Sequence, residues 1–213
     1  MLPPYRHRSP LEEPLSLDNL PGDIDWGGRI AYLDRDGVIN RWKENYVNSL
    51  GDVEILAGSG KAIASLRRIG FRICVVTNQS PIGRGLWGHE VLEQINDRIQ
   101  ELLLDEDREA ELDLILYSPY APSEGSWSRK PNPGMLEAGR QLIENAHRFP
   151  GEHNVLSYGE EWVDRPSEST SFLIGDRESD ILAAERFGVK GILCDPDSGI
   201  SDVIHRVLDL EER

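Results

Sequence analysis

The chain has 213 residues and a formal net charge of −15 at pH 7, with 38 Asp and Glu against 23 Lys and Arg. This length is enough for one substantial hydrophobic core, and the acidic surface disfavours nucleic acid as a partner because it repels phosphate backbones. An anionic substrate would therefore need a local positive pocket. With two cysteines, no apolar signal core and no membrane-spanning run, we expect a cytoplasmic protein without membrane contacts.

Residues 1–28 form the first segment, which contains five prolines and no clear hydrophobic period. We interpret it as an extended arm, either loose or wrapped on the rest of the chain, and residues 29–213 as a single domain. The first strand is predicted over 29–34. It is followed by 41–58, an irregular stretch that we interpret as a small flap over the end of this strand.

Two carboxylates, Asp34 and Asp36, follow the apolar run of this strand. Residues two apart in an extended backbone point the same way, so the two groups repel each other unless a cation or a proton lies between them. Oxygen ligands of this kind suit Mg²⁺. Taken alone, the motif also fits a solvated turn. It fits a calcium loop less well, because Val38 and Ile39 stand where further oxygen ligands are needed.

The rest of the chain alternates apolar strands with amphipathic helices. Further strands are predicted over 71–76, 112–117, 171–175 and 189–194. Helices are predicted over about 59–69, 89–104, 133–148, 178–187 and 201–210. Nearly continuous apolar strands separated by helices predict an α/β fold, with a central parallel sheet, right-handed crossovers and helices on both faces.

Polar side chains gather where the predicted strands end. They are Asp34 and Asp36 after the first strand, Thr77 and Asn78 after the second, and Asp176 with Asp180 after the fourth. Lys130 lies just before a predicted helix N-terminus, which is itself favourable for anions. Because ligands of such sheets bind at the carboxyl ends of the strands, we expect these groups to converge on a metal and a phosphate. A carboxylate there can attack phosphorus, and a second one can act as general acid and base.

Four segments carry a family resemblance: 34–40 (DRDGVIN), 77–80 (TNQS), 129–135 (RKPNPGM) and 175–180 (GDRESD). Together they resemble the four motifs of haloacid dehalogenase (HAD) superfamily phosphatases. The residues within these motifs are similar to those of the D-glycero-D-manno-heptose-1,7-bisphosphate 7-phosphatase branch, which is close to histidinol-phosphate phosphatases. The resemblance covers roughly residues 29–195, and it implies a Rossmann-like three-layer sandwich and a Mg²⁺-dependent phosphatase of a small phosphorylated metabolite.

The resemblance also implies a role for each matching residue. Asp34 would be the nucleophile, and Asp36 the general acid and base, with its main-chain carbonyl on Mg²⁺. Lys130 would stabilise the nucleophile and the phosphate. The phosphate would be held by Thr77 and Asn78, and the metal by Asp34, Asp36, Asp176 and Asp180. Arg129 would contact the remote part of the substrate, or else be a solvated loop cation. The same two interpretations apply to Arg84, for which we favour a solvated cation.

Three departures from the family pattern concern the loops. The heptose-bisphosphate branch carries structural zinc before the lysine, but here the matching positions are Ser118, Tyr120, Ser126 and Ser128, so we expect no zinc. Packing of Tyr120 and Trp127 would hold this loop instead. The segment 149–170 resembles an insertion, which we interpret as a surface loop or as a lid or dimer contact using Tyr158 and Trp162. Neither usual cap position has room for a cap domain, which predicts an open site.

Four functions are compatible with these observations. The first is hydrolysis of a sugar phosphate, with removal of the 7-phosphate from D-glycero-D-manno-heptose 1,7-bisphosphate as the leading case. Two alternatives within enzymes are a histidinol-phosphate-type phosphatase and a polynucleotide 3′-phosphatase, which shares the Thr-Asn-Gln turn but conflicts with the acidic composition. The last is a non-catalytic phosphometabolite-binding protein, against which the intact acidic residues and Lys130 argue.

Overall fold

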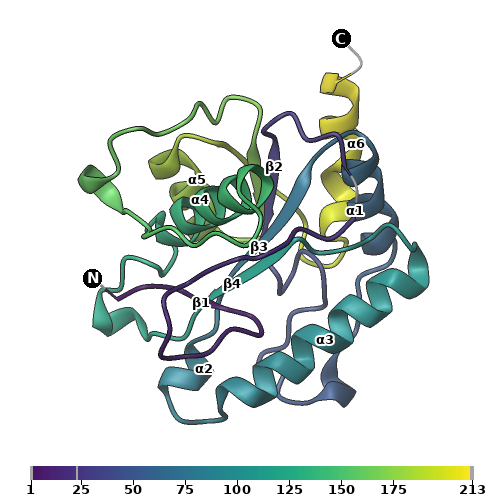
Figure 1. Cartoon of the computed structure of the whole chain (residues 1–213). Helices are drawn as coiled ribbons and strands as arrows, with labels where there is room; N and C mark the ends of the chain where they lie inside the picture. Colours follow the sequence, from purple (N-terminus) through teal and green to yellow (C-terminus); the bar gives the residue numbers. More distant parts are fainter. Residues whose placement is uncertain (1, 23, 212–213) are drawn as a thin grey trace.

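A central sheet organises the molecule (Figure 1). The computed structural model describes residues 2–22 and 24–211, and six strands pair within this part in the order β1-β4-β3-β2-β5-β6. The strands are β1 (Tyr5–Arg6), β2 (Ile30–Leu33), β3 (Arg72–Asn78), β4 (Leu114–Ser118), β5 (Phe172–Gly175) and β6 (Lys190–Leu193). All neighbours pair in parallel except β1, which runs antiparallel to β4. The predicted α/β class with a parallel sheet is therefore confirmed.

Helices cover both faces of the sheet (Figure 1). They are α1 (Ser59–Arg68), α2 (Ser80–Gly83), α3 (His89–Glu106), α4 (Gly134–Arg148), α5 (Glu178–Phe187) and α6 (Ile200–Glu211). Alternate strand residues feed two cores, since Leu33 and Val75 pack with α1, α3 and α6, whereas Tyr32 and Cys74 pack with α4 and α5. This gives the expected three-layer arrangement, and the residues that the structure describes include no large cap domain.

The bounds of the five predicted helices agree with the structure to within about two residues, whereas the short α2 was not predicted. Asn132 suits an N-cap by composition, yet α4 begins only at Gly134, with Pro133 in the capping position. The Asn132 side chain instead donates to the Ser126 carbonyl at 3.0 Å, so it closes the preceding loop. None of the described helices is both long and apolar enough to cross a bilayer.

The N-terminal arm lies along the domain and adds a strand to it. Tyr5 pairs with Tyr117 and Arg6 with Leu116, so β1 forms the edge of the sheet beside β4. The Tyr5 ring also lies 6.3 Å from the Tyr120 ring, which is on the loop that follows β4. Further along the arm, the Pro21 carbonyl accepts hydrogen bonds from two arginines of the domain. Residues 1 and 23 of the predicted arm and 212–213 of the predicted domain lie outside the described residues.

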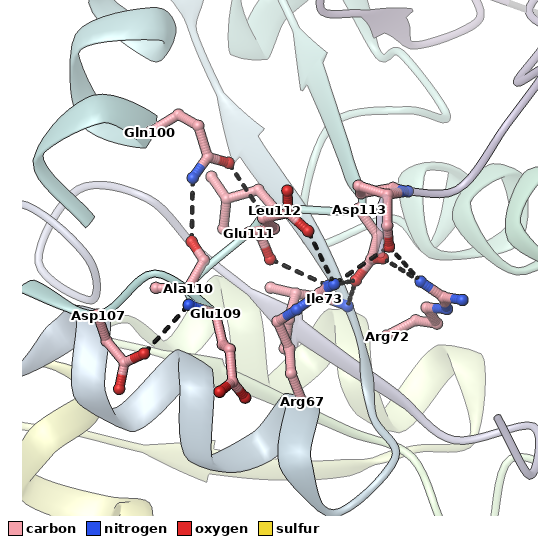
Figure 2. A network of polar contacts seen from close by, with 11 residues as sticks. Arg67, Arg72, Ile73, Gln100, Asp107, Glu109, Ala110, Glu111, Leu112 and Asp113 are labelled. Carbon is pink, nitrogen blue, oxygen red and sulfur yellow. Dashed lines mark hydrogen bonds and ion pairs between the residues drawn. The ribbon is translucent and has the colours of Figure 1, made fainter. Parts of the chain in front are cut away.

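A buried ion network stabilises the end of the sheet where β3 and β4 begin (Figure 2). Asp113, whose side chain is 0% exposed, accepts from Arg67 of α1 at 2.6 Å and from Arg72 of β3 at 2.8 Å. The Ile73 main-chain N–H also donates to Asp113 at 2.6 Å. From α3, Gln100 bridges the main chain at residues 110 and 112. The network therefore ties α1, α3 and two strands together at the end opposite the polar residues discussed next.

Candidate active site

A cavity of about 300 Å³ opens at the carboxyl ends of β2 and β3. The predicted site residues that line it are Asp34, Asp36, Thr77, Asn78, Arg129 and Lys130. The predicted flap contributes Trp42, Lys43, Tyr46 and Val47 to the same cavity. Residues up to about a hundred positions apart in the sequence thus lie together, because the parallel strands end at the same side of the sheet.

Asp34 and Lys130 form the centre of the site. The Lys130 ammonium lies 3.0 Å from an Asp34 carboxylate oxygen and 2.6 Å from Asp180, and all three side chains are largely or fully buried. Burial raises the pKa of Asp34 to about 7; Lys130 opposes this, and Asp180 and Asp176 add to it. Burial lowers the pKa of Lys130, but the two carboxylates outweigh it and raise that pKa above the ordinary value. Lys130 is therefore a cation placed where an anion would bind.

Three carboxylates at this point form a group that fits a hard cation. Asp34, Asp176 and Asp180 each offer an oxygen, and these oxygens all lie within 4.8 Å of one another. The Asp176 Oδ1 atom is buried without a hydrogen-bond donor, and burial raises the pKa of this residue. Gly37 makes the approach possible, because at φ +82° a side chain there would meet Asp176 at 2.6 Å. Carboxylate oxygens are the ligands that Mg²⁺ prefers. The three acids offer such oxygens close together, and the buried Asp176 Oδ1 has no other hydrogen-bond partner.

Asp36 is held by donors on three sides. Arg35 donates to both its oxygens at 3.0 and 2.9 Å, Asn40 at 2.9 Å and Gln79 at 3.0 Å. Burial raises the pKa of Asp36, but Arg35 and these amide donors outweigh it and hold the pKa below the ordinary value. Asp36 is therefore an anion at neutral pH, as a general base must be. The buried Arg35 and Gln79 were quoted within motifs but given no role by the sequence reasoning.

The turn after β3 places Thr77 and Asn78 differently. The Thr77 hydroxyl accepts from Gln79 at 2.9 Å and faces the cavity that Asp34 lines. The Asn78 side chain instead bonds the main chain of Lys130, donating to its carbonyl at 3.0 Å and accepting from its N–H at 3.1 Å. Both ends of this amide are thus occupied, and its contact in the structure is with the lysine loop.

A rim of four cations surrounds the cavity, namely Lys43, Arg84, Arg129 and Arg177. Burial and the nearby Arg84 lower the pKa of Arg129, with a further contribution from Arg177. Arg84 is exposed at the edge of the cavity and donates to the Tyr46 hydroxyl at 3.2 Å, so its position is compatible with a solvated cation and with a contact to substrate. This rim supplies the local positive pocket that an anionic substrate requires on an acidic protein.

The loop before Lys130 is held by hydroxyl groups as well as by aromatic side chains. Ser126 and Ser128 lie 2.8 Å apart, Ser128 donates to Ser118 at 3.3 Å, and all three are buried. Ser126 also donates to the Leu2 carbonyl of the arm at 3.1 Å. Three of the four positions that the family resemblance assigned to zinc ligands therefore form a hydrogen-bonded serine cluster, whose hydroxyls are not zinc ligands, and the fourth is Tyr120.

The segment 149–170 packs away from the cavity. Trp162 stacks on Phe187 at 6.4 Å, and both Trp162 and Tyr158 pack against the core beneath α4 and α5. None of the described residues of this segment lines the cavity, so the structure gives no support to the lid interpretation. Its two aromatic side chains anchor it to the domain instead.

Comparison with known proteins agrees with this geometry. The HAD-hydrolase-like family matches residues 127–203. The chain is 34% identical over 171 residues to D-glycero-beta-D-manno-heptose-1,7-bisphosphate 7-phosphatase of Pseudomonas aeruginosa, which covers 80% of this chain and 83% of that protein. The corresponding D-glycero-D-manno-heptose-1,7-bisphosphate 7-phosphatase of Chlorobaculum tepidum is 35% identical over 172 residues, covering 78% and 77%. The chain belongs to the HAD-type phosphatase family.

Solved structures of this family share the fold. D,D-heptose 1,7-bisphosphate phosphatase from B. bronchiseptica, determined with magnesium and phosphate, matches with a TM-score of 0.69 and 24% identity over 85% of this chain and 99% of that one. A putative HAD-like phosphatase from Mesorhizobium loti matches with a TM-score of 0.61 and 25% identity over 93% and 92%. Both similarities extend over nearly the whole domain, so the HAD-type fold applies to the chain as a whole.

Proposed function

We propose that this phosphatase removes the 7-phosphate from D-glycero-D-manno-heptose 1,7-bisphosphate through an aspartyl-phosphate on Asp34. The observation that carries the proposal is the cavity itself, which holds a nucleophile paired with a buried lysine on its floor and four cations on its rim. A substrate with two phosphates matches both features, one at the floor and one at the rim. The relatives named above act on such a compound, which supports the same choice.

The side chains divide the chemistry among them. Asp34 attacks phosphorus, and Lys130, already 3.0 Å away, offsets the charge of the phosphate oxygens. The Thr77 hydroxyl faces the same space and donates to one of these oxygens. Asp36 acquires a proton from solvent or from the substrate phosphate as the substrate binds, and it gives this proton to the leaving oxygen. Asp36 then takes a proton from the water that hydrolyses the aspartyl-phosphate.

A metal ion completes this site. Asp34, Asp176 and Asp180 are the residues that would hold Mg²⁺, together with the main-chain carbonyl of Asp36. When bound, the ion supplies positive charge that offsets the repulsion between the Asp34 carboxylate and the phosphate. Lys130 alone faces Asp34 and Asp180 as well as the incoming phosphate, so one ammonium cannot neutralise all three.

Phosphate release across a panel of substrates tests the proposal. The panel holds both anomers of heptose 1,7-bisphosphate, fructose 1,6-bisphosphate, histidinol phosphate and a 3′-phosphorylated oligonucleotide, each with Mg²⁺. We expect the highest kcat/KM for one heptose anomer. Uniformly weak release from every compound would reject the heptose assignment, and preference for histidinol phosphate or the oligonucleotide would replace it with that substrate.

Two variants separate the enzyme from a contaminant. Asp34→Asn removes the nucleophile while keeping the size of the side chain, and we expect no release above background. Asp105→Asn makes the same chemical change at an exposed position near the end of α3 that does not line the cavity, and it serves as the matched control with wild-type turnover. If Asp34→Asn kept the activity of the wild type, the proposed mechanism would be wrong.

A further inference from the structure

Glu137 is a fully buried carboxylate that the proposed reaction does not use. Its side chain is 0% exposed on α4, and three groups donate to it. They are the Trp127 indole at 2.6 Å, the Arg165 guanidinium at 2.6 Å and the Gly159 main-chain N–H at 3.1 Å. One donor belongs to the loop before Lys130, and the other two belong to the segment 149–170. Glu137 thus joins two segments that are separated by the whole of α4 in the sequence.

Trp127 transmits this contact to the residues at the cavity. It stands two residues before Arg129, and its carbonyl accepts from the Gly134 N–H at 3.1 Å, which closes the loop over residues 127–134. The fit is close, because a side chain at Gly134 would meet the Trp127 carbonyl at 2.6 Å. A shift of Trp127 therefore disturbs the loop that precedes α4, in which Arg129 lies.

Arg129 is the residue that such a shift affects most. Lys130 is fixed independently by its ion pairs with Asp34 and Asp180. Arg129 instead donates to the Tyr120 carbonyl at 2.9 Å, and Tyr120 belongs to the same loop. If the loop relaxes, Arg129 loses its place at the rim, while the group that faces the reacting phosphate stays where it is.

We infer that Glu137 is a positioning residue that couples the segment 149–170 to the substrate-binding position of Arg129. The inference rests on the proposed function, in which Arg129 contacts the remote phosphate. The segment 149–170 would then contribute to substrate binding, because Arg165 and Gly159 donate to the Glu137 carboxylate, which in turn accepts from Trp127. Arg165 is itself fixed from its other side, with its guanidinium 5.1 Å from the Trp162 ring.

The chain offers a matched control for loss of stability. Arg140, one turn further along α4, donates to Glu168 at 2.5 Å, and both side chains are buried. This pair also joins α4 to the segment 149–170, but Arg140 contacts the Gly28 carbonyl and Ser171, far from the lysine loop in sequence. Glu168→Gln therefore weakens the same junction without removing a contact of Trp127.

The experiment compares Glu137→Gln, Trp127→Phe and Glu168→Gln with the wild type. Hydrogen exchange reports whether the amides of residues 126–134 lose protection, independently of activity. Kinetics are measured with heptose 1,7-bisphosphate and with para-nitrophenyl phosphate, which has no second phosphate. For Glu137→Gln and Trp127→Phe we expect faster exchange in 126–134 and a KM for the bisphosphate raised about tenfold, the effect of losing one hydrogen bond to a charged group. The kcat and the KM for para-nitrophenyl phosphate should stay within about twofold, given that Lys130 does not move.

Each other result decides against the inference. Faster exchange without a selective rise in KM would show that Glu137 holds the loop but has no part in substrate binding. An equal rise in KM for Glu168→Gln would show a general effect of stability. If the wild type releases no phosphate from any compound, the proposed function fails, and the exchange data still decide whether Glu137 holds the loop.

Discussion

Asp34→Asn should make the metal-free protein more stable while it abolishes turnover. Three carboxylates, Asp34, Asp176 and Asp180, lie within 4.8 Å of one another, and Lys130 is the buried cation among them. Burial raises the pKa of Asp34 from 3.8 to about 7, so ionising this group works against folding. An amide of the same size cannot ionise, so it avoids the burial of a charge as well as the repulsion by Asp180 and Asp176.

The size and the pH dependence of the effect follow from that shift. Because each pKa unit corresponds to about 1.4 kcal/mol, the three-unit difference between folded and unfolded chains corresponds to about 4 kcal/mol above pH 7. The folded state binds the proton more tightly, so this group's contribution to stability is largest at low pH. It is lost as the pH rises from about 4 to about 7. The advantage of Asn over Asp should therefore be about 4 kcal/mol at pH 8 and less than about 2 kcal/mol at pH 5.

Thermal unfolding in a chelating buffer measures this difference. For a chain of this length, we expect Asp34→Asn to raise the Tm at pH 8 by roughly 8–16 °C, with a smaller rise at pH 5. Asp105→Asn, at an exposed position near the end of α3, is the control and should leave the pH dependence of the wild type nearly unchanged. A lower Tm for Asp34→Asn at pH 8, or an equal gain at both pH values, would refute the argument that the buried, ionised Asp34 destabilises the metal-free protein.

Three further predictions concern the metal, the lysine and the far end of the sheet. At a hundred times its Kd, Mg²⁺ should stabilise the wild type by about 2.7 kcal/mol in thermal melts and Asp34→Asn by less, and exhaustive chelation should stop turnover. Lys130→Met should lower kcat about 10²–10³-fold in phosphate-release assays, because it removes the cation beside Asp34. Asp113→Asn should cost about 3–5 kcal/mol in urea unfolding, since it leaves Arg67 and Arg72 buried without their charge partner. Its kcat/KM at 25 °C should equal that of the wild type, and a loss there would mean that the two ends of the sheet are coupled.

The architecture was predictable because it depends on local patterns. Strands buried on both faces must be continuously apolar, as at 30–33 and 73–76, and each helix between them shows one apolar face. The parallel sheet then places the residues that follow each strand at a common end. That rule alone brings Asp34, Thr77 and Asp176 together, although they are widely separated in the chain.

Features that depend on a distant partner were not predictable in this way. β1 consists of Tyr5 and Arg6, and a two-residue run carries no strand signal without knowledge of β4. Arg35 is only 2% exposed, and its burial depends on Asn96 of α3, which accepts from it at 3.2 Å. Nothing local distinguishes such a residue from a solvated arginine in a turn.

The burial of the serine cluster (Ser118, Ser126 and Ser128) was also not predictable from the local sequence. Small hydroxyl side chains in a polar loop usually indicate solvent exposure, and they showed only that zinc does not fit. Their burial follows from the Leu2 carbonyl, more than a hundred residues away, and from their contacts with one another. Hydroxyls satisfy each other within a buried group, whereas each one alone would lose hydrogen bonds to water.

Support for the lysine loop is therefore spread over three contacts that come from different parts of the chain. The Leu2 carbonyl of the arm accepts from Ser126, and the Asn78 side chain of β3 binds the Lys130 main chain. The Glu137 carboxylate accepts from both Trp127 and Arg165. A tetrahedral metal fixes a loop through one compact set of bonds, but these contacts fix separate points of it. Mutations in the arm or in 149–170 should consequently alter substrate affinity, although no described residue of either segment lines the cavity. The substrate preference of this phosphatase is then a property of how these outer segments pack, as well as of the residues that carry the chemistry.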